Sequence, residues 1–225
     1  MEENVMDKLR LRFEKTGRAV YISHLDLMHT IQRGFSRAGY ELKYSEGYNP
    51  HPIISIALPL SVGASSRCEI LDFKLKGDTD LSALPEKLNN ALPEGITVVE
   101  AYEAERKPSE IKWLEINGTF EYDGNNAEAM LPKLSEFFST DEIVIEKRTK
   151  RGMGEADIKP MIREISFTAP NSSEVLLNAV ISAQEPTLNP EHLVSALLQK
   201  APEIAPDFAK FERINIFDAD MAAFR

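Results

Sequence analysis

The sequence lacks the features that mark membrane, secreted and metal-cluster proteins. Its 225 residues include one cysteine, Cys68, which excludes an internal disulfide and any zinc or iron–sulfur site made of cysteines from this chain alone. No apolar run approaches the roughly 20 residues that span a bilayer. The first residues are acidic and lack the basic and apolar segments of a signal peptide. We therefore expect a cytoplasmic protein without a membrane segment.

An overall excess of positive charge is also missing, since the formal net charge is −10. The charge is unevenly distributed along the chain. Residues 113–146 carry one basic and eight acidic side chains, whereas residues 147–163 carry six basic and two acidic ones. This separation predicts faces that meet different partners. A solvated loop that balances the acidic stretch would give the same pattern, so both interpretations stay open.

Hydrophobic periodicity in the first half predicts a β-α-β-β-α-β order. The alternation of apolar and basic residues in Lys8–Phe13 is typical of a half-buried strand. Ser23, with Asp26 three residues later, predicts a capped helix start, and Gly39 predicts its end. The remaining strands and the second helix are expected at residues 41–44, 53–58, 69–75, 81–92 and 96–101.

The second half repeats this order with one additional strand. Extended and helical segments are expected at residues 113–122, 130–138, 142–147, 161–167, 175–183, 189–197 and 211–217. The resulting fold class is α+β, with two tandem ferredoxin-like units at residues 1–107 and 108–225. Each unit would have an antiparallel sheet with helices on one face.

The first candidate nucleic-acid-binding group lies on the first strand. Lys8, Arg10 and Arg12 would point away from the helices at intervals of ~6.6 Å, close to the phosphate spacing of a single strand. Ion pairing across the sheet with Asp72 and Glu69 is the competing interpretation. The glycine–aromatic signature of the RNA-recognition motif is absent from the sequence, so stacking of bases on this sheet is not expected.

Two further basic groups could contact a phosphate backbone. His29, Arg33 and Arg37 are spaced to form one row along the first helix. A glycine-containing loop at residues 147–154 could bring backbone N–H groups to an oxyanion. It lacks the Gly-Lys-Ser/Thr ending of a nucleotide-binding loop, so nucleotide hydrolysis is not expected. The candidate cations of this loop are Lys147, Arg148, Lys150 and Arg151.

His24, Asp26 and His51 are the candidate catalytic residues, because imidazoles near carboxylates can carry general acid–base chemistry. Asp26 is equally explained as a capping group, and His51 could simply order its loop. No histidine pair has metal-binding spacing, so we expect no metal and no cofactor. His51 stands between two prolines, which indicates a structured loop. The motif residues of this loop are Glu46, Gly47, Tyr48, Asn49 and His51.

Several motifs resemble a bacterial family of radical-SAM-linked proteins of unknown function. They are Tyr21–Asp26, Arg37–Gly39, Tyr44–Pro52, Leu58–Gly63 and Asp157–Pro160. The resemblance covers nearly the whole chain and implies a bacterial cytoplasmic protein that works with a radical SAM enzyme. This chain has one cysteine, so the partner would have to supply the three-cysteine cluster. The tandem layout is also similar to RAMP-type RNA-processing proteins, a likeness of architecture that does not establish activity.

These observations favour a non-catalytic accessory protein that binds structured RNA during ribosomal or transfer RNA modification or processing. Two alternatives remain. A metal-independent ribonuclease would use His24 and His51, and a docking module would bind only the radical SAM enzyme.

Overall fold

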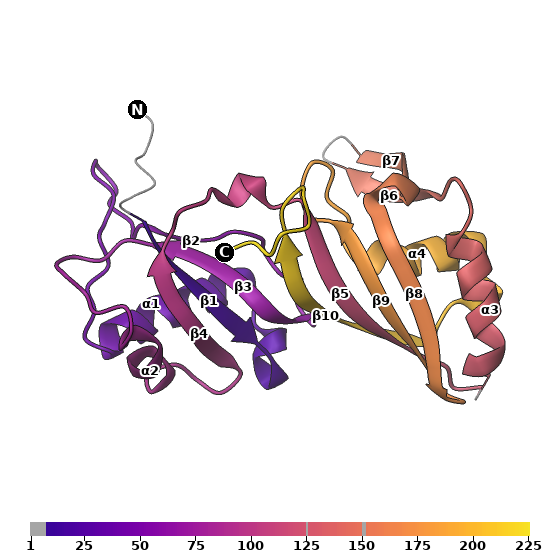
Figure 1. The fold of residues 1–225 in the computed structure, drawn as a ribbon, viewed down its shortest axis with the longest axis horizontal. Coiled ribbons are helices and arrows are strands. Elements are labelled where there is room, and N and C mark those ends of the chain that lie inside the picture. Colours follow the sequence, from indigo (N-terminus) through magenta and orange to yellow (C-terminus); the bar gives the residue numbers. More distant parts are fainter. Residues whose placement is uncertain (1–7, 125, 150–151) are drawn as a thin grey trace. The chain divides into compact units, whose positions relative to one another are not determined.

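The computed structural model describes residues 8–124, 126–149 and 152–225 (Figure 1). The chain divides into two compact units, which we call unit 1 (Met1–Glu110 with Arg225) and unit 2 (Ile111–Phe224). Both are mixed α+β with antiparallel sheets. Within the described ranges, no helix is long and apolar enough to cross a membrane.

Unit 1 has an antiparallel sheet in which β4, β1 and β3 are neighbours in that order and β2 also pairs with β3. Helices α1 and α2 contribute to one hydrophobic core on one face of this sheet. Short 3-10 helices lie at Gly17–Tyr21 (η2) and Pro108–Glu110 (η3). The main elements are β1 (Leu9–Lys15), α1 (His24–Arg37), β2 (Ile54–Ile56), β3 (Ser65–Phe73), α2 (Leu84–Asn89) and β4 (Ile96–Glu103).

Helix α1 begins and ends where local sequence chemistry predicts. The Asp26 N–H donates to Ser23 Oγ at 3.2 Å, and the Ser23 hydroxyl donates to the Asp26 carboxylate at 2.7 Å. Gly39, at φ +83°, follows the helix and adopts a backbone conformation that favours glycine. The helix then packs on the sheet through Phe35, whose ring centroid lies 4.9 Å from that of Phe73. The capped α1 helix expected from the sequence is confirmed.

Unit 2 has an antiparallel sheet in the order β10-β5-β9-β8 and a separate pair, β6 and β7. Short 3-10 helices lie at Lys159–Met161 (η4) and Pro202–Ile204 (η5). The main elements are β5 (Trp113–Glu121), α3 (Ala127–Phe138), β6 (Val144–Thr149), β7 (Gly152–Asp157), β8 (Ile162–Asn171), β9 (Glu174–Ser182), α4 (Glu191–Lys200) and β10 (Phe208–Phe217).

The expectation of a loop in the basic segment at residues 147–154 is wrong, because most of it belongs to the β6–β7 pair. Lys147 pairs with Gly154 and Arg148 pairs with Met153 in an antiparallel ladder. The ladder is held from one side by α4. The Glu146 N–H donates to the side-chain oxygen of Gln199 at 2.8 Å, and the Gln199 amide donates to the Glu146 carbonyl at 3.0 Å. The glycines therefore lie in a strand, where their sequence suggested a turn.

We expect Gly95→Ala to destabilise the protein more than Gly77→Ala. Both glycines have positive φ, +89° and +74°, so each alanine pays the about 1–2 kcal/mol that a left-handed conformation costs. A Cβ at Gly95 would also meet the backbone oxygen of Thr16 and approach Ala19 Cβ to 2.9 Å, whereas a Cβ at Gly77 would meet nothing within 4 Å. Urea unfolding of both variants measures the difference. Equal losses would contradict this account of Gly95.

Candidate functional site

Arg10 is buried and bound to a carboxylate, so it is not available to a phosphate. Its Nε lies 2.6 Å from Asp72 Oδ1 and its Nη2 lies 3.0 Å from Asp72 Oδ2. The same Nη2 donates to the Arg106 carbonyl at 2.8 Å. Arg10 is fully buried and Asp72 is 8% exposed. The expectation that Arg10 offers its charge to nucleic acid is wrong, and the competing interpretation, a cross-strand pair with Asp72, is confirmed.

The other two predicted cations, Lys8 directly before β1 and Arg12 within it, are not equivalent to Arg10. Lys8 and Arg12 are both partly exposed, and Lys8 lines a cavity with Asp72. Arg12 lies opposite Glu100 of β4 in the strand register. Glu69 does not share their face, because it lies opposite Phe13 on the side of the helices. There it acts on buried Lys15: burial lowers the pKa of Lys15, and the charge of Glu69 opposes that shift.

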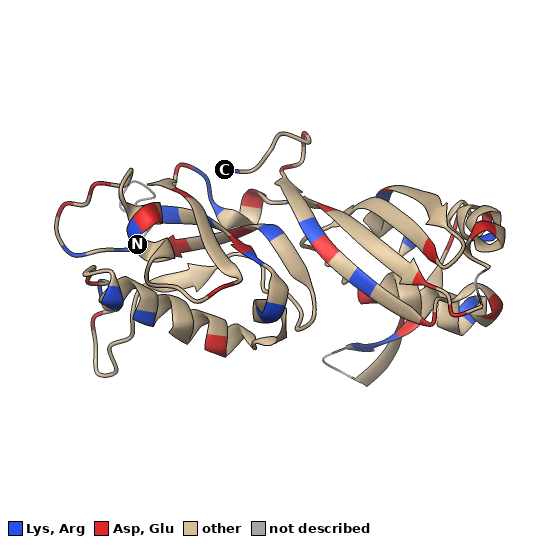
Figure 2. Ribbon diagram, turned by 90° about the horizontal axis from the view of Figure 1, so that it is seen from below, with Lys and Arg blue, Asp and Glu red and all other residues tan. Residues whose placement is uncertain are grey.

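The basic residues of unit 1 do not form one continuous row. Arg12 alternates with the core residue Phe13 and so faces away from the helices, whereas Arg33 lies on the exposed side of α1. Figure 2 shows Lys and Arg positions spread over helix, strands and loops and interleaved with acidic ones. Any contact with a phosphate backbone must therefore depend on a smaller group of residues.

The predicted row on α1 is present, but one member is already engaged. His29 and Arg33 are exposed on the outer side of the helix. Arg37 uses Nε and Nη2 to donate to the Ala91 carbonyl, at 3.0 and 2.7 Å. Arg37 thus fastens the end of α1 to the turn after α2, in a fixed orientation at the surface.

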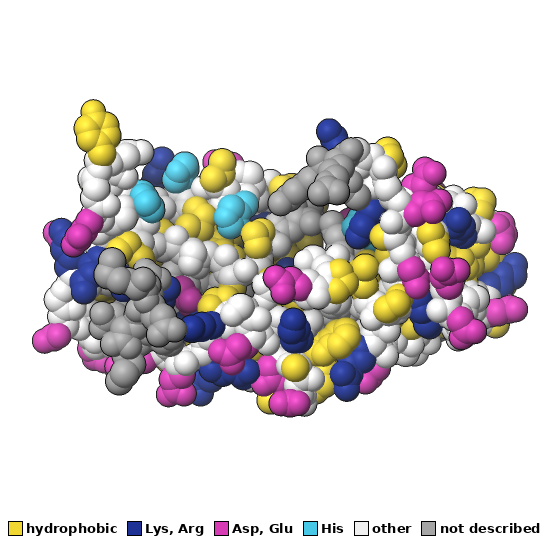
Figure 3. Space-filling model, turned by 90° about the horizontal axis from the view of Figure 1, so that it is seen from above, with side chains coloured by type: hydrophobic (Ala, Val, Ile, Leu, Met, Phe, Trp, Pro, Cys, Tyr) yellow, Lys and Arg dark blue, Asp and Glu magenta, His cyan; other side chains and the backbone are white. Residues whose placement is uncertain are grey.

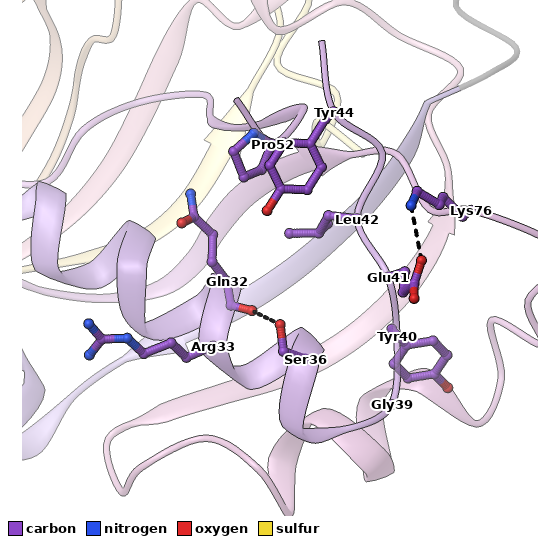
Figure 4. A pocket seen from close by; sticks show the side chains of 10 residues that line it. All are labelled: Gln32, Arg33, Ser36, Gly39, Tyr40, Glu41, Leu42, Tyr44, Pro52 and Lys76. Carbon is purple, nitrogen blue, oxygen red and sulfur yellow. Dashed lines mark hydrogen bonds and ion pairs between the residues drawn. The ribbon is translucent and has the colours of Figure 1, made fainter. Parts of the chain in front are cut away.

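A cavity of about 610 Å³ lies between the second half of α1 and the segment that follows it (Figure 4). Figure 4 shows Tyr44 beside Pro52, with its hydroxyl directed towards Gln32 and with Leu42 near the tyrosine, on the side away from Gln32. An ion pair of 3.0 Å joins Glu41 and Lys76 at another side. The lining consists of Gln32, Arg33, Ser36, Gly39, Tyr40, Glu41, Leu42, Tyr44, Pro52 and Lys76.

A second cavity of about 350 Å³ adjoins the first at Arg33, which lines both. The other lining residues are Thr30, Arg37, Ala91, Leu92 and Pro93. Two cavities with different chemistry therefore share the exposed Arg33. The first contains tyrosines and an amide, and the second contains the fixed guanidinium of Arg37.

The loop with the Tyr-Asn-Pro-His-Pro motif is closed at its base by Ser45 and His51. The Ser45 N–H donates to the His51 carbonyl at 2.8 Å, the His51 N–H donates to Ser45 Oγ at 3.1 Å, and Ser45 Oγ lies 2.9 Å from His51 Nδ1. Tyr48 is fully exposed within this loop. The neighbouring motif residues Glu46, Gly47 and Asn49 are exposed as well. The interpretation that His51 orders its loop is supported by these bonds.

The structure gives little support to a catalytic pair of His24 and His51. His51 lines a cavity of about 450 Å³ with Lys8, Glu46 and Lys74, but His24 does not line it. Asp26 is exposed and bonded to Ser23. Figure 3 shows histidine side chains at the surface on one face of the molecule. Among the residues that the structure describes, no group of three or more His, Cys, Asp or Glu could hold a metal.

In unit 2, Lys147 is partly exposed and Arg148 is exposed on β6, while Lys150 and Arg151 lie outside the described residues. Sequence reasoning missed His192, which lies in the first turn of α4. Burial lowers the pKa of His192, and the charge of Lys147 lowers it further. Within the described ranges, the buried His192 Nδ1 has no hydrogen-bond partner. The charge of Lys147 on β6 therefore disfavours protonation of His192 on α4.

Comparison with known protein families identifies the family of this chain. The chain belongs to a family described as "Uncharacterized protein conserved in bacteria (DUF2344)", whose model matches residues 8–190. No curated protein matches the chain.

Two solved structures are similar to this chain. A chain from "Crystal Structure of a Cbf5-Nop10-Gar1 Complex" aligns with a TM-score of 0.52 and 11% identity, over 94% of this chain and 49% of that chain. This protein therefore spans about half of that chain, and the likeness concerns the fold alone. An "Unknown Protein from Galdieria sulphuraria" aligns with a TM-score of 0.27 and 12% identity, over 92% of this chain and 98% of that chain.

We expect Asp72→Ala to destabilise the protein by about 3–5 kcal/mol, because it leaves the buried Arg10 guanidinium without its carboxylate. The double variant Arg10→Met with Asp72→Leu should recover most of this loss, since it removes both buried charges and preserves volume. Denaturant unfolding of Asp72→Ala, of the single variants Arg10→Met and Asp72→Leu, and of the double variant measures the loss and the coupling. A double variant no more stable than Asp72→Ala would contradict the assignment.

We expect the protein to lose stability as the pH falls below about 6.5, partly through His192. The pKa of His192 is lowered in the folded state, so unfolding takes up a proton and acid favours the unfolded chain. His192→Gln should flatten the pH dependence of the melting temperature between about pH 7 and pH 5. This range includes the ordinary histidine pKa of about 6.5. Exposed His29, replaced in the same way, provides the control. Identical pH profiles for the wild type and His192→Gln would refute the link.

Proposed function

We propose that this protein is a non-catalytic accessory protein that binds structured RNA through unit 1 and works with a radical SAM enzyme. The observation that carries the proposal is the position of Arg33 between two cavities, one of which is lined by Tyr44 and Tyr40. Proteins that recognise RNA loops and ends combine aromatic surfaces for bases with cations for the backbone. This part of unit 1 provides both kinds of group within a few residues of α1.

The site must act locally, because the protein as a whole repels polyanions. The net charge is −10, and the acidic side chains interleave with the basic ones in unit 1. Exposed charges farther apart than a Debye length, about 8–10 Å at physiological salt, are largely screened from one another. Arg33 and Arg37 lie beside the cavities, while Glu41 is neutralised by Lys76. The immediate surroundings are therefore positive.

The strand orders support a ferredoxin-like assignment for each unit. In unit 1, β4, β1 and β3 are neighbours and β2 pairs with β3, as a β-α-β-β-α-β chain requires. In unit 2 the corresponding order is β10-β5-β9-β8, with β6 and β7 added before β8. We propose that the two units are separate domains, with the boundary in the chain near residues 107–111.

A radical SAM partner is supported by the motif resemblance and by an exposed apolar patch of unit 1. We define the partner patch as Tyr21, Leu25 and Val62, which are 74%, 68% and 61% exposed. The Gly63 N–H donates to the Val20 carbonyl at 2.9 Å, which brings the loop at Val62 next to η2. This patch also favours a second candidate function, docking on the partner enzyme without RNA.

We expect Arg33→Ala to weaken RNA binding and to reduce its salt dependence. The change removes one phosphate contact, so the slope of log K against log salt should fall by about 1. Filter binding of a stem-loop RNA between about 50 and 200 mM salt measures both effects. Over this range of salt the affinity changes enough for the slope to be determined. Arg18→Ala is the matched control, because Arg18 is exposed on η2 and lines neither cavity.

Absence of RNA binding by the wild type at low salt would overturn the proposal and leave the docking function. In that case the purified radical SAM partner should bind after nuclease treatment, and Leu25→Asp should abolish that binding. Equal losses for Arg33→Ala and Arg18→Ala would show general electrostatic attraction and would contradict a site at α1.

A further inference from the structure

We infer that the cavity between α1 and residues 39–44 holds one unstacked nucleobase, with the adjoining phosphates placed along Arg33 towards Arg37. This inference rests on the proposed RNA-binding function and adds the part of the RNA that is recognised. It assigns Tyr44 as the stacking surface and Gln32 as the group that meets the edge of the base.

The cavity has the size and wall chemistry of a site for a planar group. Its volume of about 610 Å³ falls within the range of ligand pockets, about 300–1,000 Å³. Buried Leu42 also lines the cavity, beside Tyr44, and makes this part of the wall apolar. Tyr44 is 54% exposed, so its ring is accessible to a base. Stacking on an exposed aromatic ring requires no particular base and contributes about 1–3 kcal/mol per base.

The Tyr44 ring is held in place before any ligand arrives. Tyr44 and Pro52 form an antiparallel backbone bridge, and Figure 4 shows the two rings side by side. The adjacent Ser45 and His51 pair closes the loop directly after this bridge. A fixed aromatic surface loses little conformational entropy on binding, which favours a stacked ligand.

The distribution of polar groups favours a neutral planar group inside and a charged group outside. Tyr44 directs its hydroxyl towards Gln32, and both residues line the cavity. The carboxamide of Gln32 can both donate to and accept from the edge of a base. Arg33 extends away from Tyr44, towards the neighbouring cavity that it shares with Arg37. Of the two cations that line the first cavity, Lys76 is paired with Glu41 and Arg33 extends away from Tyr44, so a phosphate is expected at Arg33 and not beside the tyrosine.

The second cavity continues the site in the direction that a backbone would take. Arg37 is fixed by two hydrogen bonds to the Ala91 carbonyl, and a guanidinium has five N–H donors, so donors remain for a phosphate. Arg33 stands between this group and the base cavity. A nucleotide with its base against Tyr44 would therefore present its phosphates to two arginines one helical turn apart.

The test compares two RNAs that each contain one 2-aminopurine and differ by a single nucleotide. In the first, the 2-aminopurine is paired with uridine in a complete duplex; in the second, that uridine is removed, which leaves the 2-aminopurine bulged. Fluorescence anisotropy gives the affinity, and 2-aminopurine emission reports stacking of the bulged base. We expect the wild type to prefer the bulged RNA and to quench its emission. Tyr44→Ala should lose about fivefold or more in affinity for the bulged RNA alone, as expected for one stacked base.

Two further variants separate stacking from other roles of the tyrosine. Tyr44→Phe keeps the aromatic face and should retain the preference and the quenching. Tyr48→Ala is the matched control, because Tyr48 is fully exposed in the adjoining loop and does not line the cavity. If Tyr44→Ala fails to fold, as judged by circular dichroism, Gln32→Leu on the surface of α1 takes its place and should also reduce the preference.

The outcomes distinguish the inference from the function on which it rests. Binding of both RNAs with equal affinity, or an equal loss for both in Tyr44→Ala, would overturn the base cavity and leave RNA binding intact. No binding of either RNA at low salt would overturn the proposed function itself. A preference for the bulged RNA that Tyr48→Ala abolishes and Tyr44→Ala preserves would move the site to the loop and refute the assignment.

Discussion

The buried pair between Arg10 and Asp72 determines how unit 1 can use its charges. The two residues lie directly opposite each other on β1 and β3, and both N–H···O contacts are within 3.0 Å. A slip of one residue would turn Arg10 into the hydrophobic core and expose Leu11, so the pair and the core specify the same register. In that register Arg10 is buried in its pair with Asp72. Of the predicted cations of unit 1, Arg10 is thus unavailable to a partner, whereas Arg33 is exposed on α1.

A protein with a net charge of −10 cannot recruit RNA by a broad positive field. Recognition would have to combine a small number of cations with contacts that do not depend on charge. The arrangement around Arg33 is of this kind, because the arginine lies between an aromatic cavity and the guanidinium of Arg37. Selectivity for an unpaired base would then follow from stacking, and the acidic remainder of the chain would disfavour nonspecific binding.

Local signals were predictable from the sequence, whereas distant pairings could be given only as alternatives. The cap formed by Ser23 and Asp26 involves residues three apart, so the sequence was sufficient to predict it. The β6–β7 hairpin was missed because Gly152 and Gly154 suggest a loop until their ladder partners are known. The burial of Arg10 depends on a carboxylate 62 residues away, chosen among several acidic residues by the sheet register alone.

The 610 Å³ cavity beside α1 could not be predicted from the sequence either. Its position also explains the role of the Tyr-Asn-Pro-His-Pro motif. Gln32 comes from α1, Tyr44 from the segment after it and Lys76 from beyond β3, so no spacing in the sequence reveals that they meet. The Tyr-Asn-Pro-His-Pro loop suggested chemistry because His51 was its one titratable imidazole. In the structure His51 binds Ser45 at the base of the loop, directly beside the bridge between Tyr44 and Pro52. The histidine and the prolines thus act on the proposed site indirectly, by fixing the aromatic wall on which a base would stack.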